Sequence, residues 1–171
     1  MRPIFHLCEE SRHCFTTFVA NRWRDFCWQG DEEGVYWLGC VMSIHFGEHL
    51  TIDGYGGKKE KLSDKELVLR CLTELPKILE MHVLMEPAVI WAEPSGRKDP
   101  GGWSGFVIIA ESHISIHTFP GRRFLSADVY TCRNGVDVQK IIAYFSDTFA
   151  LSDVEEHFIK RGERYPEHDV D

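Results

Sequence analysis

The residues with the most evident chemical potential lie in one stretch, 110–120, which reads AESHISIHTFP. It sets a serine hydroxyl, Ser112, close to two imidazoles, His113 and His117. A serine hydroxyl is a weak nucleophile and needs an activating base before it can react. On a strand the two imidazoles would lie about 13 Å apart, so they could not bind one zinc ion together. Taken alone, the stretch is typical of a polar strand with hydrogen-bonded histidines.

The elements that must position this stretch are predicted from apolar spacing and turn signals. Alternating or β-branched runs predict strands over 35–46, 49–55, 88–92, 103–110, 113–119, 123–131 and 154–159. A capping box that starts at Ser63 opens a helix with an apolar stripe, and Pro76 near the end of that stripe predicts a kink or an early stop. A second helix is predicted over 136–149. This order indicates an α+β fold, a two-layer α/β sandwich in which helices cover one face of an antiparallel sheet.

The two faces of this sheet are expected to differ in chemistry. In 113–118 and 124–132, one set of alternate residues is aliphatic and suits contact with helices. The other set carries imidazole, hydroxyl, carboxyl and thiol groups: His113, Ser115, His117, Ser126, Asp128, Tyr130 and Cys132. Few of the long charged side chains usual on a solvated face occur there. We therefore expect this face to be the floor of a site or the seam of a dimer.

The composition narrows the functional class. The chain has 171 residues, enough for one domain with a sizeable core, and a net charge of -8. That charge argues against a nucleic-acid partner, which needs clustered Lys and Arg. None of the six cysteines forms a Cys-x-x-Cys pair, and no apolar run approaches the ~20 residues needed to span a bilayer. The N-terminus lacks the apolar segment of a signal peptide, so we expect a cytoplasmic protein with reduced thiols and no membrane partner.

Residues 1–34 mix aromatic and charged residues without a clean period. We interpret them as an N-terminal extension of unknown role, with a short helix near 14–27. The main domain is expected to span 35–171.

The stretch at 110–120 closely resembles the self-processing site of the bacterial and archaeal S-adenosylmethionine decarboxylases, whose motif runs E-S-H-[IL]-S-I-H-T-[WFY]-P. Three further matches lie at that family's spacing: GWSG at 102–105 resembles G-[VT]-[ST]-G, DVYTC at 128–132 resembles D-V-[FY]-T-C, and GEH at 47–49 with DGYG at 53–56 resembles G-x-H…D-x-Y-G. Together the matches cover about 45–160. The resemblance implies a self-cleaving proenzyme of that family's fold.

The resemblance implies that the chain is cut between Glu111 and Ser112 into a β chain, 1–111, and an α chain, 112–171. Ser112 would become a pyruvoyl group whose ketone binds a cationic primary amine as a Schiff base, so neither pyridoxal phosphate nor a metal is required. The resemblance assigns His117 as the base of processing, Ser104 as the donor to the oxyanion of the acyl shift, and Cys132 as the proton donor in turnover. It also implies a homodimer of cleaved protomers, (αβ)2, with sites at the seam.

Two departures from the family's pattern bear on the substrate. Gly121 stands where the family has a Glu that can hold the ribose hydroxyls, and Lys98 stands where an adenine-stacking aromatic is usual, with Trp91 or Trp103 as possible replacements. We therefore treat Gly121, Lys98 and Trp103 as candidate substrate-binding positions. The favoured function is S-adenosylmethionine decarboxylation for spermidine synthesis. The alternatives are decarboxylation of ornithine or arginine on the same scaffold, and a non-catalytic regulatory paralogue.

Overall fold

The computed structural model describes residues 6–7, 14–19, 22–31, 34–40, 45–166 and 168–169, which belong to two compact units, 1–44 and 45–171. In the first unit four antiparallel strands pair in chain order: β1 (His6–Leu7), β2 (Cys14–Val19), β3 (Arg22–Asp31) and β4 (Gly34–Cys40). The helix expected near 14–27 is therefore wrong. Aromatic and β-branched residues in the sequence CFTTFV favour a strand over a helix. The second unit begins at His45, later than the boundary expected after residue 34.

The second unit contains a six-stranded sheet in the order β10–β5–β9–β8–β7–β6, and every neighbouring pair is antiparallel. Its strands are β5 (Gly47–Tyr55), β6 (Ala88–Ala92), β7 (Gly102–Ile109), β8 (Ser112–Phe119), β9 (Phe124–Thr131) and β10 (Asp153–Arg161). The predicted strands of this unit are confirmed to within two residues at most ends. The last of them forms one edge of the sheet, as expected.

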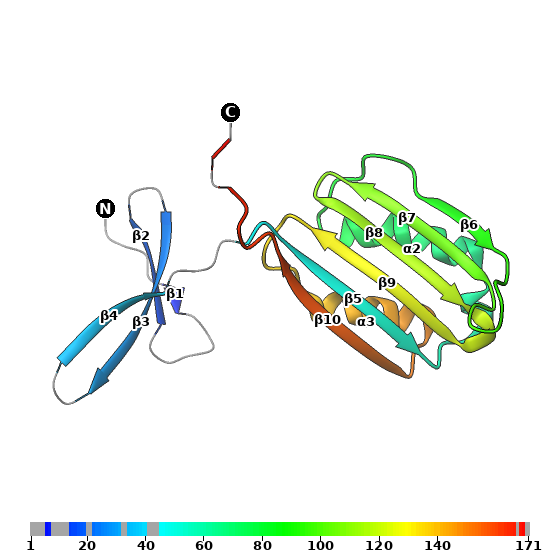
Figure 1. Cartoon of the computed structure of the whole chain (residues 1–171), viewed down its shortest axis with the longest axis horizontal. Coiled ribbons are helices and arrows are strands. Elements are labelled where there is room, and N and C mark those ends of the chain that lie inside the picture. The colour runs from blue at the N-terminus through cyan, green and yellow to red at the C-terminus, as the bar shows by residue number, and fades with distance from the viewer. Residues whose placement is uncertain are drawn as a thin grey trace. The chain divides into compact units, whose positions relative to one another are not determined.

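Three helices accompany the sheet: α1 (Lys59–Leu62), α2 (Lys65–Ile78) and α3 (Val138–Phe149). Figure 1 shows α2 and α3 lying side by side along one face of the sheet, which confirms the two-layer α+β architecture. The core between the layers joins helix residues such as Leu72 and Phe145 to the aliphatic strand residues Ile114, Ile116 and Val129, all fully buried or nearly so. The hydrophobic effect thereby fixes which face of β8 and β9 meets the helices.

The start of α2 differs in detail from the expected capping box. Asp64, not Ser63, is the N-cap, and its carboxylate accepts hydrogen bonds from the N–H groups of Glu66 and Leu67. Pro76 lies in the last turn, and the helix continues to Ile78 without an earlier stop.

The face of the sheet opposite the helices, called here the open face, carries the predicted polar set together with exposed apolar side chains. Cross-strand registers place Ile90 with Ser104, Phe106 with Ser115, Ile108 with His113 and Ile159 with His49. The four apolar side chains in these pairs are between 41% and 68% exposed. An uncovered apolar surface of this kind on a sheet is typical of a protein contact surface.

Candidate functional site

Ser112 is the first residue of β8, directly after the two-residue connection Ala110–Glu111 that joins it to β7. Its φ angle is +150°, in the half of conformational space that non-glycine residues avoid. A residue held there costs on the order of 1–3 kcal/mol, and such strain persists only where the surroundings enforce it. The backbone is thus strained at the peptide bond that the sequence predicts to be cut.

Cys132 lies beside the same peptide bond. Thr131, the last residue of β9, pairs with Ser112, and the next backbone N–H, that of Cys132, donates to the carbonyl oxygen of Glu111 over 2.8 Å. A Cβ on Gly47 would collide with the carbonyl oxygen of Thr131, so glycine there lets β5 approach closely. The Cys132 side chain itself is exposed. The structure therefore brings together Glu111, Ser112 and Cys132.

The side chain of Glu111 is held by His82. Its carboxylate accepts a hydrogen bond from the backbone N–H of His82 at 3.0 Å and another from the ring Nδ1–H of His82 at 2.9 Å. Burial raises the pKa of Glu111, but these hydrogen bonds outweigh burial and leave the pKa below the ordinary glutamate value. The Glu111 side chain is only 10% exposed, whereas that of His82 is 81% exposed. Glu111 is thus an ionised group fixed by a neighbouring segment.

His117 and Ser104 form a second cluster. They are cross-strand partners on β8 and β7, and His117 Nδ1 lies 3.0 Å from Ser104 Oγ, within hydrogen-bonding distance. His117 is five residues along β8 from Ser112, a separation of about 16 Å at the rise of a strand. Within one copy of the chain these two residues are therefore too far from the Glu111–Ser112 peptide to touch it. Alternation along β8 and β9 assigns His117 and Cys132 to the open face, at opposite ends of the strands.

The candidate substrate-binding positions fall at the His117 end of the strands. Gly121 lies in the short 3-10 turn Pro120–Arg122, and a Cβ there would meet Pro100 at 3.5 Å, an ordinary contact distance. Lys98 is exposed in the loop that contains Pro100, and Arg122 donates to the carbonyl of Arg97 in the same loop at 2.8 Å. These positions therefore neighbour one another.

Trp103 lies at the same end of the strands but on the opposite, helix-covered face of the sheet. It alternates with Ser104 and packs against the helix-side core, and its indole Nε1–H donates to the carbonyl of Ser63 at 2.8 Å. Trp91 meets it edge-on, with ring centroids 5.0 Å apart.

The middle of the open face holds a hydrogen-bonded network. Arg161 Nη1 lies 3.1 Å from His49 Nδ1. Because an arginine side chain has donors and no acceptor, Arg161 must be the donor in this hydrogen bond. His49 therefore carries its proton on Nε2 and donates to Asp128 at 3.1 Å, while Ser115 donates to the other oxygen of Asp128 at 3.0 Å. The Arg161 guanidinium also lies over the Tyr130 ring, 4.8 Å from its centroid. These contacts link β10, β5, β9 and β8 and fix the floor between the two clusters.

The loop that follows Cys132 is anchored by Glu48, a buried carboxylate. It accepts hydrogen bonds from the N–H groups of Gly135 and Val136 at 2.9–3.0 Å and from His45 at 3.3 Å. Burial raises the pKa of Glu48, but the two backbone N–H groups and His45 together lower it below its ordinary value. The ionised carboxylate thus stabilises the fold.

We expect Glu48→Gln to destabilise the protein by about 1–3 kcal/mol at pH 7, because a charge-assisted acceptor is lost from a buried site. The wild-type carboxylate has a lowered pKa in the folded state, so its contribution is present above the unfolded pKa and is lost as the pH falls below about 4.3. Urea unfolding of both proteins from pH 7 downward measures this gap. The exposed carboxylate Glu155, changed to Gln, is the control and should show a far smaller loss.

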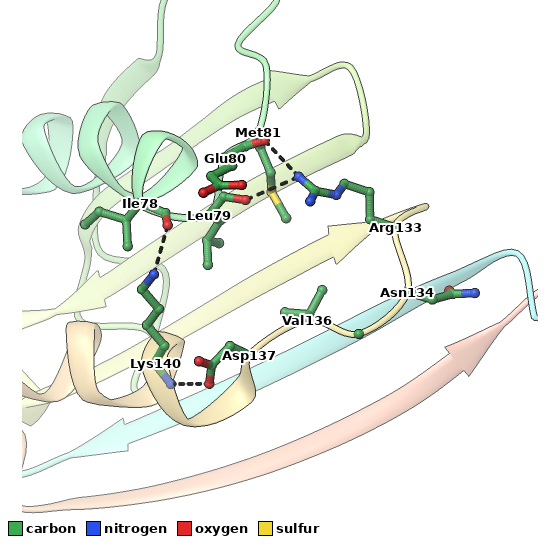
Figure 2. A pocket seen from close by; sticks show the side chains of 10 residues that line it. Ile78, Leu79, Glu80, Met81, Arg133, Asn134, Val136, Asp137 and Lys140 are labelled. Atoms are coloured by element: carbon green, nitrogen blue, oxygen red, sulfur yellow. Dashed lines mark hydrogen bonds between the residues drawn. The ribbon is translucent and has the colours of Figure 1, made fainter. Parts of the chain in front are cut away.

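A cavity of about 180 Å³ lies between the end of α2 and the loop after Cys132. Figure 2 shows the side chains of Arg133 and Lys140 reaching across it to backbone carbonyls at the end of α2. Arg133 donates to the carbonyl oxygens of Leu79 and Glu80, and Lys140 donates to that of Ile78. The cations complement the negative end of the helix and tie α2 to the loop that carries Cys132.

Sequence reasoning missed His82 and Arg133 as neighbours of the site. Neither belongs to a periodic run, and each acts through contacts 29 to 54 residues away in the chain. Glu48 lies inside the GEH match at 47–49, which was the one available signal for it. Within the described part of the chain, no group of three or more His, Cys, Asp or Glu residues could hold a metal ion. None of the described helices is long and apolar enough to cross a membrane.

Comparison with known proteins shows which family this chain is similar to. Residues 48–162 match the family model described as S-adenosylmethionine decarboxylase. An S-adenosylmethionine decarboxylase proenzyme of Clostridium botulinum is 34% identical over 116 residues, which cover 68% of this chain and 94% of the relative. The proenzyme of the same name from Pyrococcus furiosus is 32% identical over 116 residues, covering 68% of this chain and 78% of the relative.

A solved structure is similar in fold. The crystal structure of the adenosylmethionine decarboxylase from Aquifex aeolicus matches with a TM-score of 0.61 and 24% identity, over 74% of this chain and 98% of that one. The matched part of the family model lies wholly within the second unit, so the resemblance over about 45–160 is confirmed and the first unit lies outside it.

Proposed function

Because the chain belongs to the S-adenosylmethionine decarboxylase family, we propose that it is a self-cleaving, pyruvoyl-dependent carboxy-lyase that acts on S-adenosylmethionine. The observation that carries this proposal is the Glu111–Ser112 peptide, which combines a strained serine with a carbonyl that already accepts the Cys132 N–H. The product would be the aminopropyl donor of spermidine synthesis.

In the first step of self-cleavage, Ser112 Oγ attacks the carbonyl carbon of Glu111. The new C–O bond replaces the C–N bond, and the hydroxyl proton moves to the freed amine. The Cys132 N–H points at the oxygen that becomes negative, as an oxyanion donor must. A base then removes the Ser112 α-proton, and the ester eliminates the main-chain carboxylate of Glu111 to leave dehydroalanine at position 112. Water then hydrolyses the imine tautomer of dehydroalanine to a pyruvoyl group and ammonia. We assign the base to His117.

The surroundings of Ser112 fit a pyruvoyl group at that position. Such a group supplies a ketone conjugated to an amide, which accepts the electron pair left when CO₂ departs. Glu111 leaves as a new chain end, and the exposed Cys132 thiol remains next to position 112. We assign Cys132 to deliver the proton that replaces CO₂ on the substrate carbon.

The separation of about 16 Å between the two clusters supports a homodimer of cleaved protomers, (αβ)2. The His117–Ser104 pair of one copy cannot reach its own Ser112, so we place it over the Ser112 of a second copy. A two-fold axis that lies between the two open faces, parallel to the sheets and perpendicular to the strands, places the Ser112 end of each sheet over the His117 end of the other and makes two equal sites. The exposed Ile90, Phe106, Ile108 and Ile159 are then covered.

A second substrate class is favoured by Gly121, which lacks the carboxylate that the family uses for ribose hydroxyls. Loss of such a charge-assisted hydrogen bond weakens binding by about 1–3 kcal/mol. Ornithine or arginine, which have no ribose, would not be affected. The second candidate is therefore a basic amino acid decarboxylase with the same self-cleavage chemistry.

The test of the proposed function uses purified, self-cleaved protein. A denaturing gel should show two fragments, and mass spectrometry should find the smaller one starting with pyruvoyl. Each substrate is then supplied separately with a ¹⁴C-labelled carboxyl group. Labelled CO₂ from S-adenosylmethionine supports the first candidate, and labelled CO₂ from ornithine or arginine alone supports the second. An intact chain of 19.8 kDa without a reactive carbonyl contradicts both and favours a non-catalytic paralogue.

Gly121→Glu is expected to raise kcat/KM for S-adenosylmethionine roughly 10-fold, because it restores an acceptor for the ribose hydroxyls. The turn has room for the change, since the nearest atom to a Cβ is Pro100 Cβ at 3.5 Å. Gly121→Gln, of equal size but neutral, is the control and should give a smaller gain. If the charged variant gains nothing while S-adenosylmethionine remains a substrate, this pocket does not hold the ribose.

A further inference from the structure

We propose that His82 is a positioning residue for self-cleavage, acting through the Glu111 carboxylate to hold the Glu111–Ser112 peptide in its strained, reactive conformation. This inference rests on the proposed function and adds a residue to it.

The turn that precedes Ser112 has an unusual backbone geometry. A two-residue hairpin connection usually adopts a turn with positive φ at one or both central residues, which matches the twist of the strands. Neither Ala110 nor Glu111 has a positive φ, and the positive φ falls on the next residue, Ser112. This position normally suits glycine. The strained backbone conformation in this hairpin is therefore at Ser112, the reacting residue. A contact from outside the hairpin is needed to keep the turn from relaxing.

The contacts of His82 and Cys132 supply that restraint. Glu111 is held at its carbonyl by the Cys132 N–H at 2.8 Å and at its carboxylate by two donors of His82. The His82 carbonyl in turn accepts from Ala110 N–H at 2.8 Å, so His82 holds both residues of the connection. With the Glu111 side chain and carbonyl both fixed, the peptide plane ahead of Ser112 cannot rotate freely.

The position of His82 is itself determined by the end of α2. Glu80 has a φ of +55°, and hydrogen bonds run from Met81 N–H to the Pro76 carbonyl and from Glu80 N–H to the Lys77 carbonyl. This is the Schellman arrangement that ends a helix and turns the chain sharply. Met81 is then buried, and Arg133 binds the Glu80 carbonyl, as Figure 2 shows. The next residue, His82, therefore lies beside the β7–β8 connection.

His82 acts on the first chemical step. In that step the Ser112 Oγ–Glu111 carbon bond forms, the carbon–nitrogen bond breaks, and the hydroxyl proton ends on the Ser112 amine. The Nδ1–H of His82 is engaged by Glu111, which leaves the assignment of the elimination base to His117 unchanged. His82 therefore raises the rate of ester formation without touching the reacting atoms.

The experiment follows cleavage of newly purified proenzyme with time on denaturing gels. His82→Ala is expected to slow cleavage roughly 10- to 100-fold, the loss of one charge-assisted contact. His82→Asn keeps an N–H donor near the place of Nδ1 and cannot act as a base, so it should recover most of the rate. His157→Ala removes a comparable exposed His–Glu contact on β10, at 3.3 Å from Glu155, and should cleave at the wild-type rate.

Two further measurements separate positioning from a general loss of structure. In a double-mutant cycle with Glu111→Ala, the double variant should cleave no more slowly than either single variant, because both substitutions remove the same His82–Glu111 contact. Hydroxylamine, which cleaves esters, should not rescue His82→Ala, because the ester does not accumulate. His117→Ala should accumulate ester and be rescued.

Additive effects in the cycle, a hydroxylamine-sensitive ester in His82→Ala, failure of His82→Asn to recover, or an unchanged rate in His82→Ala each overturn the inference. If the wild-type chain itself never splits, the proposed function fails instead.

Discussion

Substituting alanine for Ser112 is expected to leave the polypeptide whole and to reduce decarboxylation by more than about 10³-fold. Without the hydroxyl there is no nucleophile for the Glu111 carbonyl, and no ketone can form at position 112. Gel electrophoresis measures the cleavage, and release of labelled CO₂ measures the activity. The fold should persist, because alanine retains the backbone hydrogen bonds of β8 to β7 and β9.

The matched control is Ser115→Ala, the same substitution three residues along the same strand. Ser115 donates to Asp128 in the middle of the open face and does not contact the scissile peptide. This variant should still cleave. Decarboxylation by an uncut Ser112→Ala protein at the wild-type rate would remove the basis of the proposed chemistry.

Two inactive variants are expected to restore activity when they are combined. Ser112→Ala lacks the nucleophile and His117→Ala lacks the base, so neither should form a cleaved product alone. In a mixed dimer, one site joins an intact Ser112 to an intact His117 from the other chain. Random pairing makes half of the dimers mixed and leaves one complete site in each, so about a quarter of the wild-type sites should return.

Co-expression of the two chains with different purification tags, followed by tandem purification of the mixed species, measures this recovery. In the purified mixed dimers, half of the sites should be complete. Only the chain that carries His117→Ala should be cut, since it alone retains Ser112. Cleavage that requires both intact residues on one chain, with no recovery on mixing, would contradict the shared site. The distance between Ser112 and His117 along β8 leaves no other route within a single rigid copy.

Much of the second unit could be predicted because its strands and helices obey simple periods. Alternation of Ile114 and Ile116 with His113, Ser115 and His117 is a backbone property of a strand, and the core confirms it. The N-cap was misplaced by one residue because Ser63 and Asp64 are both good capping residues. The structure uses the Ser63 carbonyl for the Trp103 indole, a tertiary contact that local pattern does not contain.

The candidate site was predicted in its residue types and only partly in its geometry. Motif spacing singled out Ser112, His117, Cys132 and Ser104, but the distances between them depend on the pairing of β7, β8 and β9. The role of His82 depends on a helix that ends with a non-glycine residue, Glu80, in a left-handed conformation. No sequence rule predicts that choice, because glycine is the usual residue there.

The strand order has a consequence for the protein once it is cut. The fragment before Ser112 would contribute β5, β6 and β7, and the fragment after it would contribute β8, β9 and β10. In the order β10–β5–β9–β8–β7–β6, β5 is interleaved between two strands of the later fragment, so the pieces stay interlocked by three ladders. Unfolding then separates two polypeptides, and recovery depends on their concentration as association reactions do. An unfolded proenzyme would refold as a single polypeptide, whereas the lifetime of the cleaved protein would be set by its unfolding rate.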